Sequence, residues 1–195
     1  LPKKFYENAI NHLYQEELGE IITDDKNIYE ELQQLYAGNP DILSKIRFYE
    51  NDAISLGTLY SFETQIQRAI SERVWMKSGA YLIIQPTEAL TVIDVNSGKN
   101  TSGKNAEEYY YKINLEAAAE ISRQLRLRNI SGIVIVDFIN MAKEEQRKEL
   151  MHQFRLSLKE DPVPVRLVDI TKLGLVELTR KKERKTLLEQ VAQLR

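Results

Sequence analysis

The pattern of hydrophobic and polar positions divides the chain into a largely helical first part and a later part in which strands alternate with helices. Apolar residues at helical spacing predict three helices in the first part, over residues 1–17, 28–36 and about 61–70. Ile21 and Ile22 predict a short strand between the first two helices, and Gly38 followed by Pro40 ends the second. We therefore expect a small α/β or mostly helical unit.

From Arg73 onward, β-branched and apolar runs typical of strands predominate. Strands are predicted at residues 74–76, 80–84, 89–95, 133–138, 165–170 and 175–179, with a hairpin turn joining the first two. Helical spacing predicts a long helix that ends at Arg128 and a second over about 142–158. Strand 89–95, the long helix and strand 133–138 form a β–α–β unit, so these two strands should be parallel. The expected fold class is α+β (mixed α/β).

Two aspartates stand at the carboxyl ends of the predicted parallel strands, Asp94 after the first apolar run and Asp137 after the second. Parallel strands end at the same edge of a sheet, so neighbouring strands about 4.8 Å apart would let both carboxylates bind one small cation. Mg²⁺ held by one or two carboxylates is usual in phosphoryl chemistry. Asn96 lies on the same strand face and is placed to orient Asp94. Strand-end aspartates also cap helices or begin turns, so a structural role stays open for each.

A glycine-rich loop between the first of these strands and the long helix offers a competing interpretation. Residues 98–105 match the phosphate-binding pattern G-x-x-x-x-G-K-[ST] except at the last position, where Asn105 replaces the hydroxyl that would bind Mg²⁺. That interpretation also leaves Asp94 unexplained. We favour a loop that brings Lys99 and Lys104 to a nucleic-acid backbone, with nucleotide binding through residues 98–104 as the alternative.

Charge is distributed unevenly over the 195 residues, whose formal net charge is -2. Residues 1–78 carry 8 Lys and Arg against 13 Asp and Glu, whereas residues 79–195 carry 19 against 16. The basic excess is clustered in residues 180–185 and in three arginines of the predicted long helix, Arg123, Arg126 and Arg128. One surface that faces a polyanion such as RNA is expected, although a solvated helix face or a frayed basic tail would explain the same charges.

Composition excludes several other classes of protein and of functional site. The chain has no cysteine, so a disulfide scaffold, a thiol nucleophile and a cysteine-ligated zinc within the chain are excluded, and two histidines disfavour a His-rich metal site. No apolar stretch approaches the roughly 20 residues that cross a bilayer, and no signal peptide is recognisable at the start. We expect a cytoplasmic protein without a membrane partner.

Three segments of the chain resemble the ribonuclease E/G family. Residues 88–97, EALTVIDVNS, resemble its first active-site segment, residues 114–139 resemble the second, and residues 173–180, LGLVELTR, are similar to the segment that closes the catalytic domain. The resemblance implies a ribonuclease H-like subdomain over residues 1–72 and a deoxyribonuclease I-like catalytic subdomain over residues 73–195.

The resemblance also implies a function, namely Mg²⁺-dependent endonucleolytic cleavage of single-stranded RNA in bacterial RNA processing and decay. Metal-activated water would attack a backbone phosphate. The family's two metal-binding catalytic aspartates match Asp94 and Asp137, and its supporting asparagine matches Asn96.

Departures from the family pattern lead us to expect a catalytic-core fragment of a longer, homo-oligomeric enzyme. An OB-fold module and a 5′-end sensing pocket normally lie upstream, and a zinc-linking cysteine pair should follow near residue 200. The loop 98–105 lacks the family's usual arginine, and Asn140 stands where an aspartate is common. A catalytically silent RNA-binding or assembly module is the alternative from another class.

Overall fold

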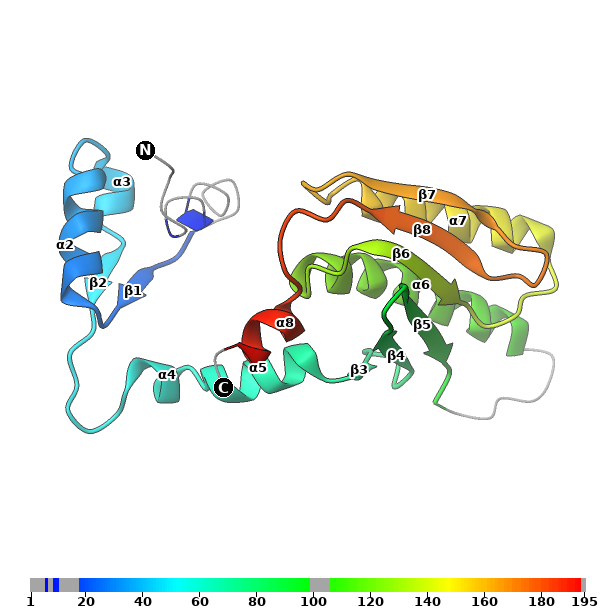
Figure 1. Cartoon of the computed structure of the whole chain (residues 1–195), viewed down its shortest axis with the longest axis horizontal. Coiled ribbons are helices and arrows are strands. Elements are labelled where there is room, and N and C mark those ends of the chain that lie inside the picture. The colour runs from blue at the N-terminus through cyan, green and yellow to red at the C-terminus, as the bar shows by residue number, and fades with distance from the viewer. Residues whose placement is uncertain (1–5, 7–8, 11–17, 99–105, 194–195) are drawn as a thin grey trace. The chain divides into compact units, whose positions relative to one another are not determined.

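The computed structural model describes residues 6, 9–10, 18–98 and 106–193, which form two compact units, Leu1–Thr64 and Gln65–Arg195 (Figure 1). This division lies N-terminal to the expected subdomain boundary between residues 72 and 73. Helices and mixed sheets together confirm the expected α+β class. The helix predicted over residues 1–17 falls mostly outside the described residues.

The first unit has a small parallel sheet. β1 (Ile21–Thr23) pairs with β2 (Ile46–Phe48), and α2 (Lys26–Leu35) connects them together with α3 (Pro40–Leu43). Asp25 caps α2, because its carboxylate accepts hydrogen bonds from the N–H groups of Asn27 and Ile28. A short α4 (Leu56–Leu59) follows, and α5 (Phe62–Ile70) leads into the second unit. The hydrophobic pattern predicted β1, α2 and α5 but not β2, α3 or α4.

The second unit is built on a six-stranded sheet with the strand order β3-β4-β5-β6-β8-β7. Its strands are β3 (Arg73–Trp75), β4 (Tyr81–Pro86), β5 (Leu90–Asn96), β6 (Gly132–Asp137), β7 (Val165–Ile170) and β8 (Val176–Arg180). β5 and β6 pair in parallel, which confirms the β–α–β prediction, and the other neighbours are antiparallel. All six strands match segments predicted from the sequence.

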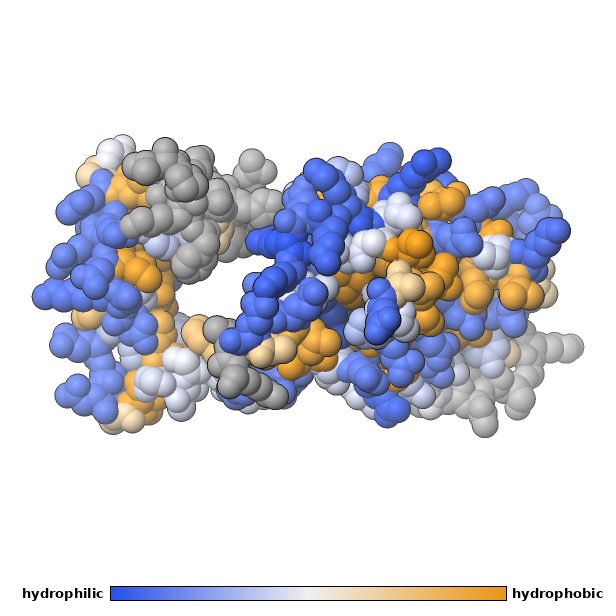
Figure 2. Space-filling model, in the orientation of Figure 1, coloured by the Kyte–Doolittle hydropathy of each residue, from blue (hydrophilic) through white to orange (hydrophobic). Residues whose placement is uncertain are grey.

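Two helices, α6 (Ala106–Leu127) and α7 (Glu144–Leu158), pack against one face of this sheet and lie behind the strands in Figure 1. The core between sheet and helices includes fully buried residues from both layers, among them Ile93, Val134, Val136, Leu178, Ile121, Leu125 and Phe154. Because strand side chains alternate, the intervening residues point to the other face, which we call the open face. Hydrophobic side chains bordered by hydrophilic ones cover this side of the sheet in Figure 2.

The basic residues 180–185 are followed by a helix and do not form a frayed tail. Residues 187–192 form α8 (Leu187–Ala192), which begins with a capping box between Thr186 and Glu189. The side-chain amide of Asn129 donates hydrogen bonds to the carbonyls of Arg184 and Lys185 and so holds the approach to α8. Among the helices of the described residues, none is long and apolar enough to cross a membrane.

Candidate functional site

Asp94 and Asp137 occupy matched positions on the two central parallel strands. Asp94, two residues before the end of β5, is the register partner of Asp137, the last residue of β6. Paired residues on neighbouring strands point to the same face of a sheet, here the open face. The preceding residues, Ile93 and Val136, point into the core and are 0% exposed, whereas Asp94 is half-buried and Asp137 is exposed. The register thus places the two carboxylates side by side on the open face, near the carboxyl ends of the two parallel strands.

Asn96 contacts Asp94 directly. Its side-chain Nδ2 donates a hydrogen bond of 2.7 Å to Oδ2 of Asp94. The two residues are separated by Val95, which points into the core, so both polar side chains lie on the open face. This bond fixes the orientation of the carboxylate, as the sequence spacing led us to expect.

The donor set at this edge fits a small hard cation. Carboxylate oxygens are the ligands that Mg²⁺ prefers, and Mg²⁺ commonly uses only one or two of them while retaining several waters. Within the described residues no group of three or more His, Cys, Asp or Glu side chains is arranged to hold a metal ion. Two carboxylates at this position could hold such a cation with waters as its remaining ligands.

A buried asparagine supports the chain immediately after Asp137. Asn114 of α6 is 0% exposed, and its Nδ2 donates a hydrogen bond of 2.7 Å to the carbonyl of Ile139. The N–H of Ile139 donates in return to Oδ1 of Asn114, at 3.0 Å. Sequence reasoning missed this role, although an amide at a core position between Ile113 and Ala117 was a usable signal.

For the RNA cleavage that the family resemblance implies, we expect Asn114→Ala to reduce the rate by about 10- to 100-fold, and we expect the variant to lower the free energy of unfolding by about 1–3 kcal/mol. The variant leaves two backbone groups of Ile139 without their partner and frees the segment that follows Asp137. Cleavage rates and urea denaturation measure the two effects. Gln153→Ala, which removes an exposed amide from α7, is the control and should change neither. Equal behaviour of both variants would contradict the role.

The start of the glycine-rich loop is fixed by a close backbone approach. Gly98 has φ +70°, and a Cβ atom there would lie 2.3 Å from the carbonyl oxygen of Gly79. Only glycine fits this conformation and this contact. The exit from β5 is therefore held against the β3–β4 turn. Lys99 and Lys104, expected to contact RNA, and the remainder of the proposed nucleotide loop lie outside the described residues.

The arginines of α6 do not join the two aspartates. Arg123 is exposed and forms an ion pair with Glu120 at 2.6 Å, and the Arg126 side chain pairs with Glu160 at 3.6 Å. Both belong to the helix that covers the opposite face of the sheet. The structure therefore does not place them beside the carboxylates on the open face.

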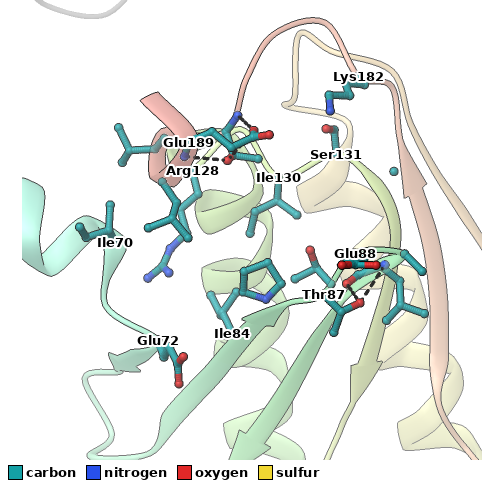
Figure 3. Close-up of a pocket in the computed structure, with 18 of the residues that line it drawn as sticks. Ile70, Glu72, Ile84, Thr87, Glu88, Arg128, Ile130, Ser131, Lys182 and Glu189 are labelled. Atoms are coloured by element: carbon teal, nitrogen blue, oxygen red, sulfur yellow. Dashed lines mark hydrogen bonds between the residues drawn. The ribbon is translucent and has the colours of Figure 1, made fainter. Parts of the chain in front are cut away.

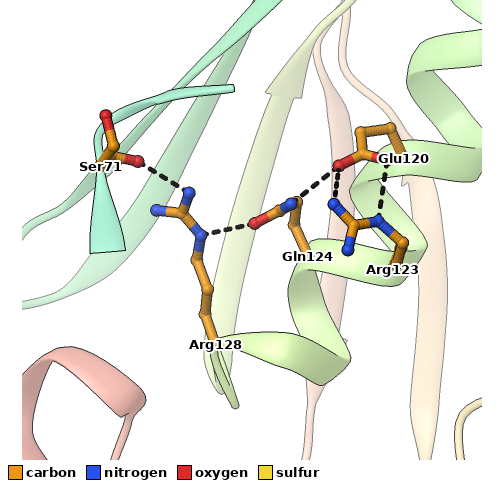
Figure 4. A network of polar contacts seen from close by, with 5 residues as sticks. All are labelled: Ser71, Glu120, Arg123, Gln124 and Arg128. Atoms are coloured by element: carbon orange, nitrogen blue, oxygen red, sulfur yellow. Dashed lines mark hydrogen bonds and ion pairs between the residues drawn. The ribbon is translucent and has the colours of Figure 1, made fainter. Parts of the chain in front are cut away.

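Arg128 differs from the exposed RNA contact that its sequence cluster suggested. It is 8% exposed, and its guanidinium donates to Oε1 of Gln124 at 2.6 Å and to the carbonyl of Ser71 at 2.7 Å (Figure 4). Burial lowers the pKa of Arg128. Burial alone would raise the pKa of Glu120, but hydrogen bonds from Arg123 and Gln124 outweigh it and lower that pKa. These contacts join the end of α6 to the segment before β3.

A pocket of about 620 Å³ lies at the other end of the sheet (Figure 3). It is lined by residues 88–91 and 130–132, where β5 and β6 begin, and by Arg128, Lys182 and residues 186–189. Asp94 and Asp137 stand at the opposite ends of the same strands. Leu90, which lines the pocket at the start of β5, is four residues from Asp94, about 13 Å at 3.3 Å per residue.

The sequence of the chain matches one family of known proteins. Residues 2–183 match the profile of the Ribonuclease E/G family. Ribonuclease G of Salmonella typhimurium is 39% identical over 171 residues, which are 87% of this chain and 35% of that protein. Ribonuclease E of Escherichia coli K12 is 36% identical over 176 residues, 89% of this chain and 16% of the relative.

Another relative matches almost the whole chain. Ribonuclease E of Synechocystis sp. is 37% identical over 194 residues, which are 97% of this chain and 28% of that protein. The chain thus spans about a third of the length of the ribonuclease G relatives that it matches. With the family profile covering nearly all of its residues, this chain belongs to the Ribonuclease E/G family.

Proposed function

We propose that the chain carries the catalytic core of a Mg²⁺-dependent endoribonuclease that cleaves single-stranded RNA in bacterial RNA processing and decay. The observation that carries the proposal is the pairing of Asp94 with Asp137 on adjacent parallel strands, with Asn96 bonded to the first carboxylate. Family membership and bacterial relatives named ribonuclease support it. By the family resemblance, the enzyme would act in the cytoplasm as a homo-oligomer.

Asp94 and Asp137 would hold Mg²⁺ in this proposal. When bound, the ion supplies a Lewis acid for the phosphate oxygens and lowers the pKa of a coordinated water. The protein's own residues supply the arrangement. Asn96 keeps the Asp94 carboxylate in one orientation, and Asn114 holds the backbone that follows Asp137.

The open face favours an unpaired RNA strand as substrate. Asp94 and Asp137 lie on a sheet surface, and the pocket of the second unit described above is at the other end of the strands. A strand with unstacked bases can lie along such a surface and present its backbone to the carboxylates. In an RNA duplex the bases are paired and stacked on one another, so they cannot spread over the surface of the β-sheet.

Cleavage of a short fluorescent RNA by the full chain tests this proposal. We expect internal cuts in single-stranded RNA with Mg²⁺, loss of cutting with EDTA, and recovery when Mg²⁺ is restored. The same sequence as RNA duplex and as single-stranded DNA should be cut much more slowly. RNA binding without cuts at any Mg²⁺ concentration would contradict the enzyme and favour the silent binding module. Equal cutting of DNA would contradict the choice of RNA.

A further inference from the structure

An aromatic pair with one exposed ring lies on the outer strand β3 and its neighbour β4. Trp75 of β3 and Tyr81 of β4 are register partners, and their ring centroids are 5.1 Å apart. Trp75 is 63% exposed, although tryptophan is highly buried on average in folded proteins. The large ring of Trp75 is therefore held against a neighbour but presented to solvent.

The pair shares the open face with the two aspartates. Tyr81 is the register partner of Asn96, and Trp75 is the partner of Tyr81, so all three point to the face that carries Asp94. The residues that alternate with the aromatic pair, Val74 and Leu82, point into the core and are buried. With strands about 4.8 Å apart, Tyr81 lies one strand from Asn96 and Trp75 two strands away, about 10 Å. Asp94 lies two residues before Asn96, roughly 7 Å along β5, so Trp75 is about 12 Å from Asp94 and within reach of a nucleotide near a phosphate held there.

A guanidinium lies on the same two rings. The Cζ atom of Arg73 is 4.6 Å from the Tyr81 ring centroid and 5.6 Å from the Trp75 ring centroid. Such contacts fall within the range of cation–π attraction. Arg73 is the register partner of Ile83, which is itself the partner of Asp94, so its positive charge is on the open face. Aromatic rings beside a fixed cation are the groups that proteins use to bind unpaired bases and their phosphates.

We propose that Arg73, Trp75 and Tyr81 form a base-stacking subsite for a nucleotide next to the phosphate that is cut at Asp94 and Asp137, an inference that rests on the proposed function. A base stacks on the exposed Trp75 ring, Tyr81 supports that ring from β4, and Arg73 attracts the adjoining phosphate. Every base has a stacking face, so the subsite distinguishes unpaired from paired strands and does not select a sequence.

The chain offers a direct probe of the subsite, because Trp75 is its single tryptophan. Fluorescence of Trp75 is measured during titration of the Asp94→Asn chain, which should not cut, with a short single-stranded RNA in Mg²⁺. We expect saturable quenching that weakens with added salt. An oligomer of equal length with abasic positions keeps the phosphate charge but lacks rings, so it should quench far less. The RNA duplex should also quench little.

Variants provide a second measurement. Trp75→Leu should raise the KM for RNA by about 5- to 50-fold with less than about a twofold change in kcat, because one stacked base is lost. Trp75→Phe should retain most of the affinity. Phe62→Leu, at an exposed aromatic position that is 47% accessible, is the matched control and should leave KM unchanged. Circular dichroism checks that each variant is folded.

The outcomes separate this inference from the proposed function. Trp75 fluorescence that does not respond to an RNA that the unmodified chain cuts would overturn the subsite. Equal quenching by the abasic oligomer, or an unchanged KM in folded Trp75→Leu, would overturn it as well. Quenching by RNA in a chain that never cuts would overturn the nuclease proposal and leave the stacking subsite standing.

Discussion

Replacement of either Asp94 or Asp137 by asparagine is expected to lower the rate of RNA cleavage by about 10³-fold or more. Asparagine has nearly the same shape as aspartate but no negative charge, so the pair can no longer hold a divalent cation with two carboxylates. The register that joins the two positions does not depend on the side chains, since it is set by the backbone ladder between β5 and β6. Folding should therefore be preserved while activity is lost.

Single-turnover cleavage at saturating Mg²⁺ and calorimetric titration with Mg²⁺ measure the rate and the metal affinity of these variants. Asp169→Asn is the matched control, because it removes an exposed carboxylate from the same sheet. Asp169 lies on β7, the outer strand opposite β3 in the strand order. Its rate should stay within about twofold of the unmodified chain, as is usual for an exposed surface position. Wild-type cleavage by Asp94→Asn or Asp137→Asn would refute the assignment of these residues.

Removal of Asp161 is expected to lower the free energy of unfolding by about 3–5 kcal/mol, because it leaves the buried charge of Arg180 without its partner. Arg180 Nε and Nη2 donate to the two carboxylate oxygens of Asp161 at 2.7 and 3.1 Å. The two side chains are 3% and 1% exposed. Arg180 also donates to Oδ1 of Asn129 and to the carbonyl of Ile130. The pair thus ties β8 to the segments before β7 and β6.

Urea denaturation of Asp161→Ala, followed by circular dichroism, measures this loss. Glu183→Ala breaks an exposed ion pair, in which the side chain of Glu183 is 45% accessible and that of Lys181 is 64% accessible. This variant should lower the free energy of unfolding by less than about 1 kcal/mol. The double variant Asp161→Leu/Arg180→Met should recover part of the stability, because no unpaired charge remains in the core. Equal losses in Asp161→Ala and Glu183→Ala would contradict this account.

The parallel strand pair and the meeting of Asp94 with Asp137 could be predicted from sequence because both follow from short-range rules. Apolar β-branched runs indicate strands, and a crossover helix makes neighbouring strands parallel. Asn96 followed from the alternation of side chains along one strand. Each of these inferences needed only the order of residues within one β–α–β unit.

The burial of two arginines could not be predicted in the same way. Arg128 and Arg180 look like parts of basic clusters in the sequence, yet both are buried. Their partners include Ser71 and Asp161, which are 57 and 19 residues away. Burial of a charge depends on such distant partners, which local pattern does not reveal. The exposure of Trp75 was not predicted either, although its hairpin was expected.

The strand order has a consequence for how the protein responds to heating. β5 and β6 are central and are bonded on both sides, whereas β3 is a short outer strand. Backbone amides of outer strands exchange with solvent through local opening at lower free energy than those in the middle of a sheet. Fraying of β3 would detach Arg73 and Trp75 but leave Asp94 and Asp137 in register. On warming, the chain should therefore lose affinity for RNA at a lower temperature than it loses the pairing of the two aspartates proposed to cleave it.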